Sequence, residues 1–212
     1  MIKTTYGTGS SIMMNIGQKP VYSDRVVTSL AWKMNGQVNY VLEGNINYTG
    51  AVITWLKDEL KLISSPSETE ILANKANPGD RSYLVPAFSG LGAPYWDSEA
   101  SGILTGITRT TGRAEIVRAG LESIAYQITD VVNAMSEESG IKIQELRVDG
   151  GPTRNKYLMQ FQSDILDRKV LVPDAEELSG IGAAYAAGRG LGLYGDEVFT
   201  RLKRREYAPE DV

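Results

Sequence analysis

Two residue types that carry much of enzyme chemistry, cysteine and histidine, are missing from this 212-residue chain. Without cysteine the chain has no disulfides and no thiolate metal sites, so a reducing, cytoplasmic compartment fits it best. Without histidine it lacks the usual acid or base near neutral pH and the commonest ligand of transition metals. Any chemistry therefore falls to carboxylates, hydroxyls, amides and backbone groups, which as oxygen ligands suit Mg²⁺.

Long apolar runs and blocks of positive charge are missing as well. No apolar stretch approaches the roughly 20 residues of a membrane helix, and the polar start at 1–10 does not resemble a signal peptide. The chain holds 22 Lys and Arg against 26 Asp and Glu, a net charge of −4. We interpret its one short basic run, at 201–206, as a solvated helix face. We therefore expect neither membrane insertion nor nucleic-acid binding.

Hydrophobic residues make up 42% of the chain, enough for a sizeable core in one large domain or two small ones. Its first part alternates in the manner of strands, which we predict at 2–8, 11–17 and 25–33. The Asn35-Gly36 pair is typical of a tight hairpin and leads to a fourth strand at 37–44. The chain therefore opens with an antiparallel meander.

Helical spacing of apolar residues follows this meander. It predicts a first helix at 49–63, a second helix that starts after Ser65 and ends before Pro78, and a long helix that includes Val117 to Met135. A strand is predicted at 103–108, ahead of the long helix. The chain then alternates between strand and helix, in segments predicted at 145–148, 155–166, 169–172 and from Ser179 onward.

This order of elements indicates the fold class. Antiparallel strands followed by alternating helices and strands predict an α/β domain in which helices cover both faces of a mixed sheet. One half of an actin-like ATPase, the ribonuclease H-like fold, has this pattern, but so do other α/β folds. The loops must therefore decide between them.

One informative loop is Gly150-Gly151, which follows the predicted strand at 145–148. Glycines let the strand end approach a flat or anionic ligand closely, just before a helix that presents free N–H groups. Asn155 falls in the first turn of that helix. The alternative is an ordinary strand-to-helix turn in which Asn155 caps the helix and no ligand is involved.

A second informative loop lies between the first two strands, at 5–11. Gly7 and Gly9 permit a tight hairpin there, while Thr8 and Ser10 offer hydroxyl and N–H groups to phosphate oxygens. The alternative is a hairpin with no ligand. This loop is not a P-loop, because no lysine follows its glycines and no helix begins there.

Five segments that cover nearly the whole chain occur in a recognisable order and spacing. They are TYGTGSSIMMNIG, VNYVLEGNINYTGAVITWLKDELKLI, VPAFSGLGAPYWD, GILTGITRTTGRAEIVRAGLESIAYQ and LRVDGGPTRNKYLMQFQSDIL. Together they resemble the carboxy-terminal domain of the FGGY carbohydrate kinases, most closely the glycerol kinase branch of that family.

The resemblance implies a nucleotide site made from five residues. Thr8 would meet the terminal phosphates, Gly50 and Thr54 would lie near the nucleotide, and Gly151 with Asn155 would meet its adenosine side. Gly50 could instead serve only a close helix contact, and Thr54 could be only a helix-face residue. Glycerol kinases typically carry Gln at position 54, so with the shorter Thr54 this contact is either absent or water-mediated.

Three further features carry alternatives. Ser11 stands where glycerol kinases typically place a Phe against the carbons of glycerol. A serine there suits a larger or more hydroxylated substrate, unless residues of another domain refill the space and glycerol remains the substrate. The small residues at 179–190 would pack beside the nucleotide cleft or simply against the sheet. Trp96 and Asp97 either shape a cleft-side loop or anchor it to the core, and we assign them no catalytic role.

The resemblance further implies that 1–212 is the nucleotide-binding half of a two-domain kinase. The amino-terminal domain is expected to supply the first phosphate loop, the metal-site aspartate, most sugar contacts and the catalytic aspartate. We therefore expect no catalytic residue and no metal ligand in this chain. The implied cofactors are ATP and Mg²⁺, and the implied partners are a small polyol or sugar and the amino-terminal domain of the same protein. A homo-oligomer is compatible with the family.

The implied reaction is transfer of the γ-phosphoryl group of ATP to a primary hydroxyl. The alternative is a non-catalytic, actin-like module that binds nucleotide to control assembly or scaffolding. The segments FQSDIL and APYWD favour the kinase, because they resemble carbohydrate kinases.

Overall fold

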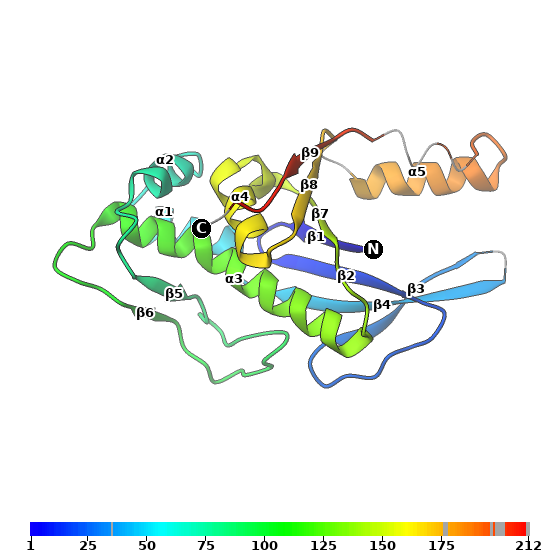
Figure 1. The fold of residues 1–212 in the computed structure, drawn as a ribbon, viewed down its shortest axis with the longest axis horizontal. Helices are drawn as coiled ribbons and strands as arrows, with labels where there is room; N and C mark the ends of the chain where they lie inside the picture. The colour runs from blue at the N-terminus through cyan, green and yellow to red at the C-terminus, as the bar shows by residue number, and fades with distance from the viewer. Residues whose placement is uncertain (35, 176–177, 196, 198–201, 211–212) are drawn as a thin grey trace.

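A seven-stranded mixed sheet forms the centre of the computed structural model (Figure 1), which describes residues 1–34, 36–175, 178–195, 197 and 202–210. The strand order is β3-β4-β2-β1-β7-β8-β9. The strands are β1 (Ile2–Tyr6), β2 (Ser10–Gly17), β3 (Val27–Met34), β4 (Gln37–Ile46), β7 (Glu145–Asp149), β8 (Lys169–Pro173) and β9 (Arg204–Tyr207).

The first four strands form the predicted antiparallel meander, whereas β7 runs parallel to β1 and β8 runs parallel to β7. Alternation explains the faces of the sheet. In β1, for example, Ile2, Thr4 and Tyr6 are buried, and the residues between them are partly exposed. The predicted hairpin turn includes Asn35, which lies outside the described residues. Its neighbour Gly36 has a positive φ of 78°.

Strand β9 was not predicted. We interpreted 201–206 as a solvated helix face, but the described part of this run lies in an antiparallel strand beside β8 or just before it. Lys169 of β8 and Glu206 of β9 form an ion pair at 2.6 Å. An edge strand tolerates such charged side chains because one of its sides faces water, so the open edge of β8 decided the conformation.

The helices and the strand at 103–105 follow the predicted order, whereas strand β5 (Tyr83–Val85) and the 3₁₀ turn η1 (Gly151–Arg154) were not predicted. The helices are α1 (Gly50–Asp58), α2 (Glu68–Lys75), α3 (Arg113–Ser139), α4 (Lys156–Leu166) and α5 (Leu178–Gly190). Strands β5 and β6 (Ile103–Thr105) form a separate small sheet. None of the helices in the described ranges combines the length and the apolarity required to cross a membrane.

Helix α1 is shorter than its predicted range of 49–63. It ends at Asp58, and Lys61 has a left-handed φ of 54°. The Leu62 N–H donates to the Leu56 carbonyl, which closes the turn. Leu60 is left 40% exposed and Ile63 is buried from the loop. The helical spacing of these apolar residues therefore overran the helix.

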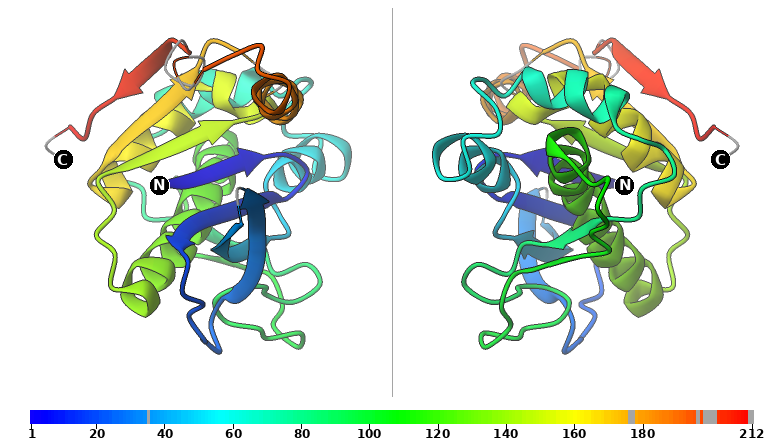
Figure 2. Two further views of the ribbon diagram at one scale, coloured as in Figure 1. Left: turned by 90° about the vertical axis from the view of Figure 1, so that its right-hand side faces the viewer. Right: turned by 90° about the vertical axis from the view of Figure 1, so that its left-hand side faces the viewer.

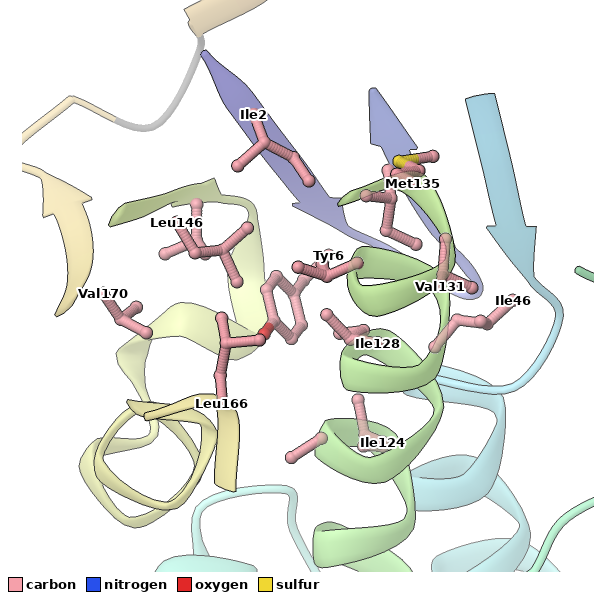
Figure 3. Packing of buried hydrophobic residues seen from close by; sticks show 14 of the residues in the cluster. Ile2, Tyr6, Ile46, Ile124, Ile128, Val131, Met135, Leu146, Leu166 and Val170 are labelled. Atoms are coloured by element: carbon pink, nitrogen blue, oxygen red, sulfur yellow. The ribbon is translucent and has the colours of Figure 1, made fainter. Parts of the chain in front are cut away.

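The main core lies between the sheet and one layer of helices. Figure 2 shows α3 and α4 together on one side of the sheet. Figure 3 shows the Tyr6 ring between Ile128 of α3 and Leu166 of α4. The Tyr6 hydroxyl donates to Gln162 Oε1 at 3.0 Å, and burial raises its pKa. Because α3 crosses the meander and also contacts α4, it holds the two halves of the sheet together.

The position of 179–190 differs from our prediction. We expected this segment to pack against the sheet or beside the nucleotide cleft. Helix α5 instead projects away from the other helices (Figure 1), and Gly188 is its one buried residue among those described. Gly188 faces the Tyr194 ring rather than the sheet.

Candidate functional site

A cavity of about 620 Å³ opens between the β1–β2 hairpin, α1, α2 and the start of α4. Its lining includes all five residues that the sequence suggested for nucleotide contact: Thr8, Gly50, Thr54, Gly151 and Asn155. Its apolar wall is made by Ile53, Leu121, Ile124 and Leu158. The fold thus brings together five segments that are far apart in the sequence, since Leu121 and Ile124 come from α3.

The β1–β2 hairpin is joined to the start of α1 through backbone groups. The Gly50 N–H donates to the Gly7 carbonyl at 3.0 Å, and the Thr49 and Ala51 N–H groups donate to the Thr8 carbonyl at 3.0 Å each. A Cβ atom at position 50 would lie 2.9 Å from the Gly7 oxygen. The close-contact interpretation of Gly50 therefore holds, and it holds at the wall of the cavity.

We expected Ser10 to face the cavity, but it does not line it. It is buried, and its hydroxyl lies 2.6 Å from that of Thr49. Its position on β2 turns it toward the core, which leaves Thr8 as the exposed hydroxyl of the hairpin.

The two adjacent glycines have separate structural reasons. Gly150 has a φ of 100°, and a Cβ atom there would lie 2.0 Å from the Tyr6 carbonyl oxygen. Only glycine fits this position without a shift of the backbone. By contrast, no atom beyond its two chain neighbours lies within 4 Å of the Cβ position of Gly151, which is exposed at the cavity. Gly150 thus allows the loop to pack against β1, and Gly151 leaves the cavity open.

Asn155 is the N-cap of α4, as one of our two interpretations predicted. Its Oδ1 accepts from the Leu158 N–H at 2.9 Å, and the Lys156 N–H donates to Glu70 Oε2 at 3.0 Å. We also expected free N–H groups at this helix start, and for these two groups that expectation was wrong. The protein itself satisfies them, because a polar side chain and a carboxylate lie within reach.

One wall of the cavity was not predicted from the sequence. Ser67, Thr69 and Glu70, at the start of α2, line it together with the preceding Pro66. No sequence signal indicated them, because α2 lies 86 residues from the part of α4 that it contacts. Only the packing of α2 against α3 and α4 places them there.

The electrostatics of the cavity come from three charged side chains in its lining. Lys57 and Arg154 are cationic and Glu70 is anionic, which leaves a net charge of +1. Such a lining favours an anionic ligand modestly. Within the described ranges, no three carboxylates lie together in a group suited to a metal ion.

A polar cluster links α3 to the start of α4 and to the segment after α2. The Tyr157 hydroxyl, in the first turn of α4, donates to Glu122 Oε1 of α3 at 2.5 Å. Burial raises the pKa of Glu122, and the Tyr157 hydrogen bond and nearby Arg118 partly offset this increase. Arg118 also donates to the carbonyls of Asn77 and Asp80 at 2.8 Å each. These bonds fix the start of α4 and the segment after α2 on α3.

Two other sequence candidates lie outside the cavity lining. Ser11 pairs with Thr5 and Asn45 in the sheet and alternates with buried Ser10, so it belongs to the opposite face from α3. Trp96 donates from Nε1 to the Arg25 carbonyl at 2.9 Å, which ties its loop to the segment before β3. This contact anchors the loop to a neighbouring segment and not to the core, because Trp96 is 51% exposed.

Comparison with known proteins identifies the family. Residues 2–191 match the model for the FGGY family of carbohydrate kinases, C-terminal domain. The chain is 53% identical over 196 residues to a glycerol kinase from Thermococcus kodakarensis, a match that covers 92% of this chain and 39% of the relative. It is 50% identical over 208 residues to a glycerol kinase from Petrotoga mobilis, covering 97% and 42%.

Solved structures agree. The crystal structure of Plasmodium falciparum glycerol kinase with ADP matches with a TM-score of 0.92 and 37% identity, covering 99% of this chain and 43% of that one. A xylulose kinase from Lactobacillus acidophilus matches with a TM-score of 0.83 at 22% identity, a likeness of fold. The predicted actin-like α/β fold class is thereby confirmed.

The chain spans about two fifths of the length of the curated relatives it matches. The family model covers most of the chain. Four of the five segments that resemble the family contribute residues to the cavity lining. The chain belongs to the FGGY family of carbohydrate kinases, as a C-terminal domain of that family.

Proposed function

We propose that this domain is the nucleotide-binding part of an ATP-dependent kinase for glycerol or for another polyol or sugar. The observation that carries the proposal is that Thr8, Gly50, Thr54, Gly151 and Asn155 line one cavity. Its volume of about 620 Å³ is typical of sites for small molecules and cofactors.

The lining fits a nucleotide in chemistry as well as in size. Gly151 leaves room for a flat ring to approach the backbone, and Ile124 and Leu158 offer it an apolar surface. Thr8 presents a hydroxyl toward the phosphate end, and Lys57 adds a positive charge to the lining. Thr54 is too short for the contact that a glutamine makes, so its contact with the nucleotide is either absent or water-mediated.

When bound, ATP supplies the γ-phosphoryl group that passes to a primary hydroxyl, and Mg²⁺ neutralises the phosphate charge. The residues of this chain hold and orient the nucleotide. We assign the catalytic base, the metal ligands and most contacts to the polyol or sugar to an amino-terminal domain, with which this domain would share the cleft. The absence of cysteine supports a cytoplasmic protein.

Phosphoryl transfer by the longer protein that carries this domain tests the proposal. ADP release should depend on glycerol or on another member of a panel of tetritols, pentitols and ketopentoses. A protein that binds ATP but phosphorylates no member of the panel would instead support the non-catalytic scaffold function. Absence of nucleotide binding would refute both.

A further inference from the structure

A side-chain hydrogen bond in the lining of the cavity links the start of α2 to the start of α4. Asn155 Nδ2 donates to Thr69 Oγ1 at 3.0 Å, and Thr69 is only 1% exposed. The neighbouring residues form a second link, in which the Lys156 N–H donates to Glu70 Oε2 at 3.0 Å. These two links join residues that lie 86 positions apart in the sequence.

Hydrogen-bond chemistry gives the Asn155 amide one orientation. Its oxygen must face the Leu158 N–H, which can only donate. The Thr69 hydroxyl has a single proton, which it donates to the Pro66 carbonyl at 2.6 Å. Toward Asn155 it can therefore only accept, and this requires the amide nitrogen on that side.

These hydrogen bonds leave part of the amide available to a ligand. The Asn155 nitrogen carries a second proton, and its oxygen has a second lone pair, neither of which these two bonds use. Both groups belong to a residue that lines the cavity. A ligand therefore meets a donor and an acceptor that are already oriented, which reduces the entropy cost of binding.

We propose that Thr69 is a positioning residue for the nucleotide site, acting through Asn155 to fix the amide that faces the adenosine side. This inference rests on the proposed function. Without the Thr69 hydroxyl, the Asn155 amide would keep only its bond to the Leu158 N–H, and the bond from Lys156 to Glu70 would be the remaining one of these two polar links between α2 and α4.

The test compares Thr69→Val, Thr69→Ser and a matched control in the 212-residue chain. Thr129→Val is the control, because Thr129 is also buried and also accepts from a side-chain amide, Gln162 Nε2, at 3.0 Å. It lies outside the cavity lining. ADP is titrated to about 10 mM, some tenfold above a millimolar dissociation constant, while ¹H–¹⁵N spectra report the backbone and the Asn155 side-chain amide.

We expect Thr69→Val to raise the dissociation constant for ADP about fivefold, equivalent to about 1 kcal/mol at 1.4 kcal/mol per tenfold. It should also shift the Asn155 side-chain signals in the absence of ADP. Thr69→Ser keeps the hydroxyl and should recover most of the affinity. Thr129→Val should lower the melting temperature and leave the dissociation constant within about twofold.

Three outcomes would overturn the inference. If wild type binds ADP and Thr69→Val binds it equally well, Thr69 has no positioning role, although the proposed function stands. If Thr129→Val weakens binding as much as Thr69→Val, the effect is one of general stability. If no ADP-dependent shift occurs at the cavity of the wild-type chain, the proposed nucleotide site fails and the inference fails with it.

Discussion

The adjacent glycines of the β7–η1 loop allow a sharp comparison of two substitutions. Gly150→Ala places a methyl group 2.0 Å from the Tyr6 carbonyl oxygen and forces alanine to adopt a φ of 100°. That backbone conformation alone costs about 1–3 kcal/mol for a residue other than glycine. Relief of the overlap must also move β1, whose Tyr6 is 2% exposed. We therefore expect a loss of about 3 kcal/mol or more in the free energy of unfolding.

Gly151→Ala should behave differently. No atom beyond its two chain neighbours lies within 4 Å of its Cβ position, so the expected loss is below about 1 kcal/mol, mostly from the restriction that Pro152 imposes on the residue before it. Urea unfolding followed by circular dichroism measures both. With a slope of about 2 kcal/mol per molar, Gly150→Ala should lower the midpoint by about 1.5 M or prevent folding. Equal effects of the two substitutions would refute the reasoning.

The same pair separates packing from binding. Gly151→Val should leave the chain folded yet raise the dissociation constant for ADP by about tenfold, because its side chain fills the open space of the cavity. A large loss of thermal stability in Gly151→Val, with unchanged affinity, would mean that Gly151 serves only the turn.

Four further predictions follow from the site and its supports. The 212-residue chain should give a folded circular dichroism spectrum but no glycerol-dependent ADP release in a coupled assay, because we assign the base and the first phosphate loop to another domain; robust turnover would contradict this. Calorimetry with ADP should give a dissociation constant on the order of a millimolar or no detectable heat, because under the proposed function another domain supplies one wall of the cleft, and micromolar binding would argue against a shared cleft. Hydrogen bonds from the Ser82 hydroxyl, Thr111 and the Ser82 N–H, together with nearby Arg118, lower the pKa of Asp80. Ionised Asp80 should therefore stabilise the fold at pH values above its ordinary pKa, and this stability should be lost as the pH falls through the lowered pKa. Asp80→Asn should remove this part of the acid dependence of the urea midpoint. An unchanged pH profile in Asp80→Asn would refute the prediction. Ser11→Phe in the longer protein should shift the ratio of kcat/KM toward glycerol and away from larger polyols, and an unchanged ratio would show that Ser11 does not shape the pocket.

Local patterns in the sequence were sufficient for most elements. Period-two alternation marked the strands of the meander, and helical spacing marked α3 and α4, since both patterns depend on neighbours along the chain. The cap of α4 was also predictable, because Asn155 bonds to a backbone group only three residues away. The same local pattern predicted an α1 that was too long. Helix α1 ends in a turn after Asp58, and Ile63 is buried although it lies in the following loop.

The candidate site divides in the same way. Motif positions named Thr8, Gly50, Thr54, Gly151 and Asn155, and the fold gathers them around one cavity. Their contact with a nucleotide remains a prediction, as does the role of Ser11. No pattern could indicate Thr69 or Glu70, because their partners lie 86 residues away and the bonds exist only once α2 packs against α3 and α4.

The sequence by itself determined which residues have strand or helix periodicity, where glycine frees the backbone, and which motifs belong to this family. The tertiary structure decided the rest. It assigned Gly150 to the Tyr6 carbonyl and Gly151 to the cavity, and it turned the charged segment at 204–207 into an edge strand beside β8. The physical reason is that these outcomes depend on surfaces and backbone groups contributed by distant segments, which are not encoded in the spacing of neighbouring residues.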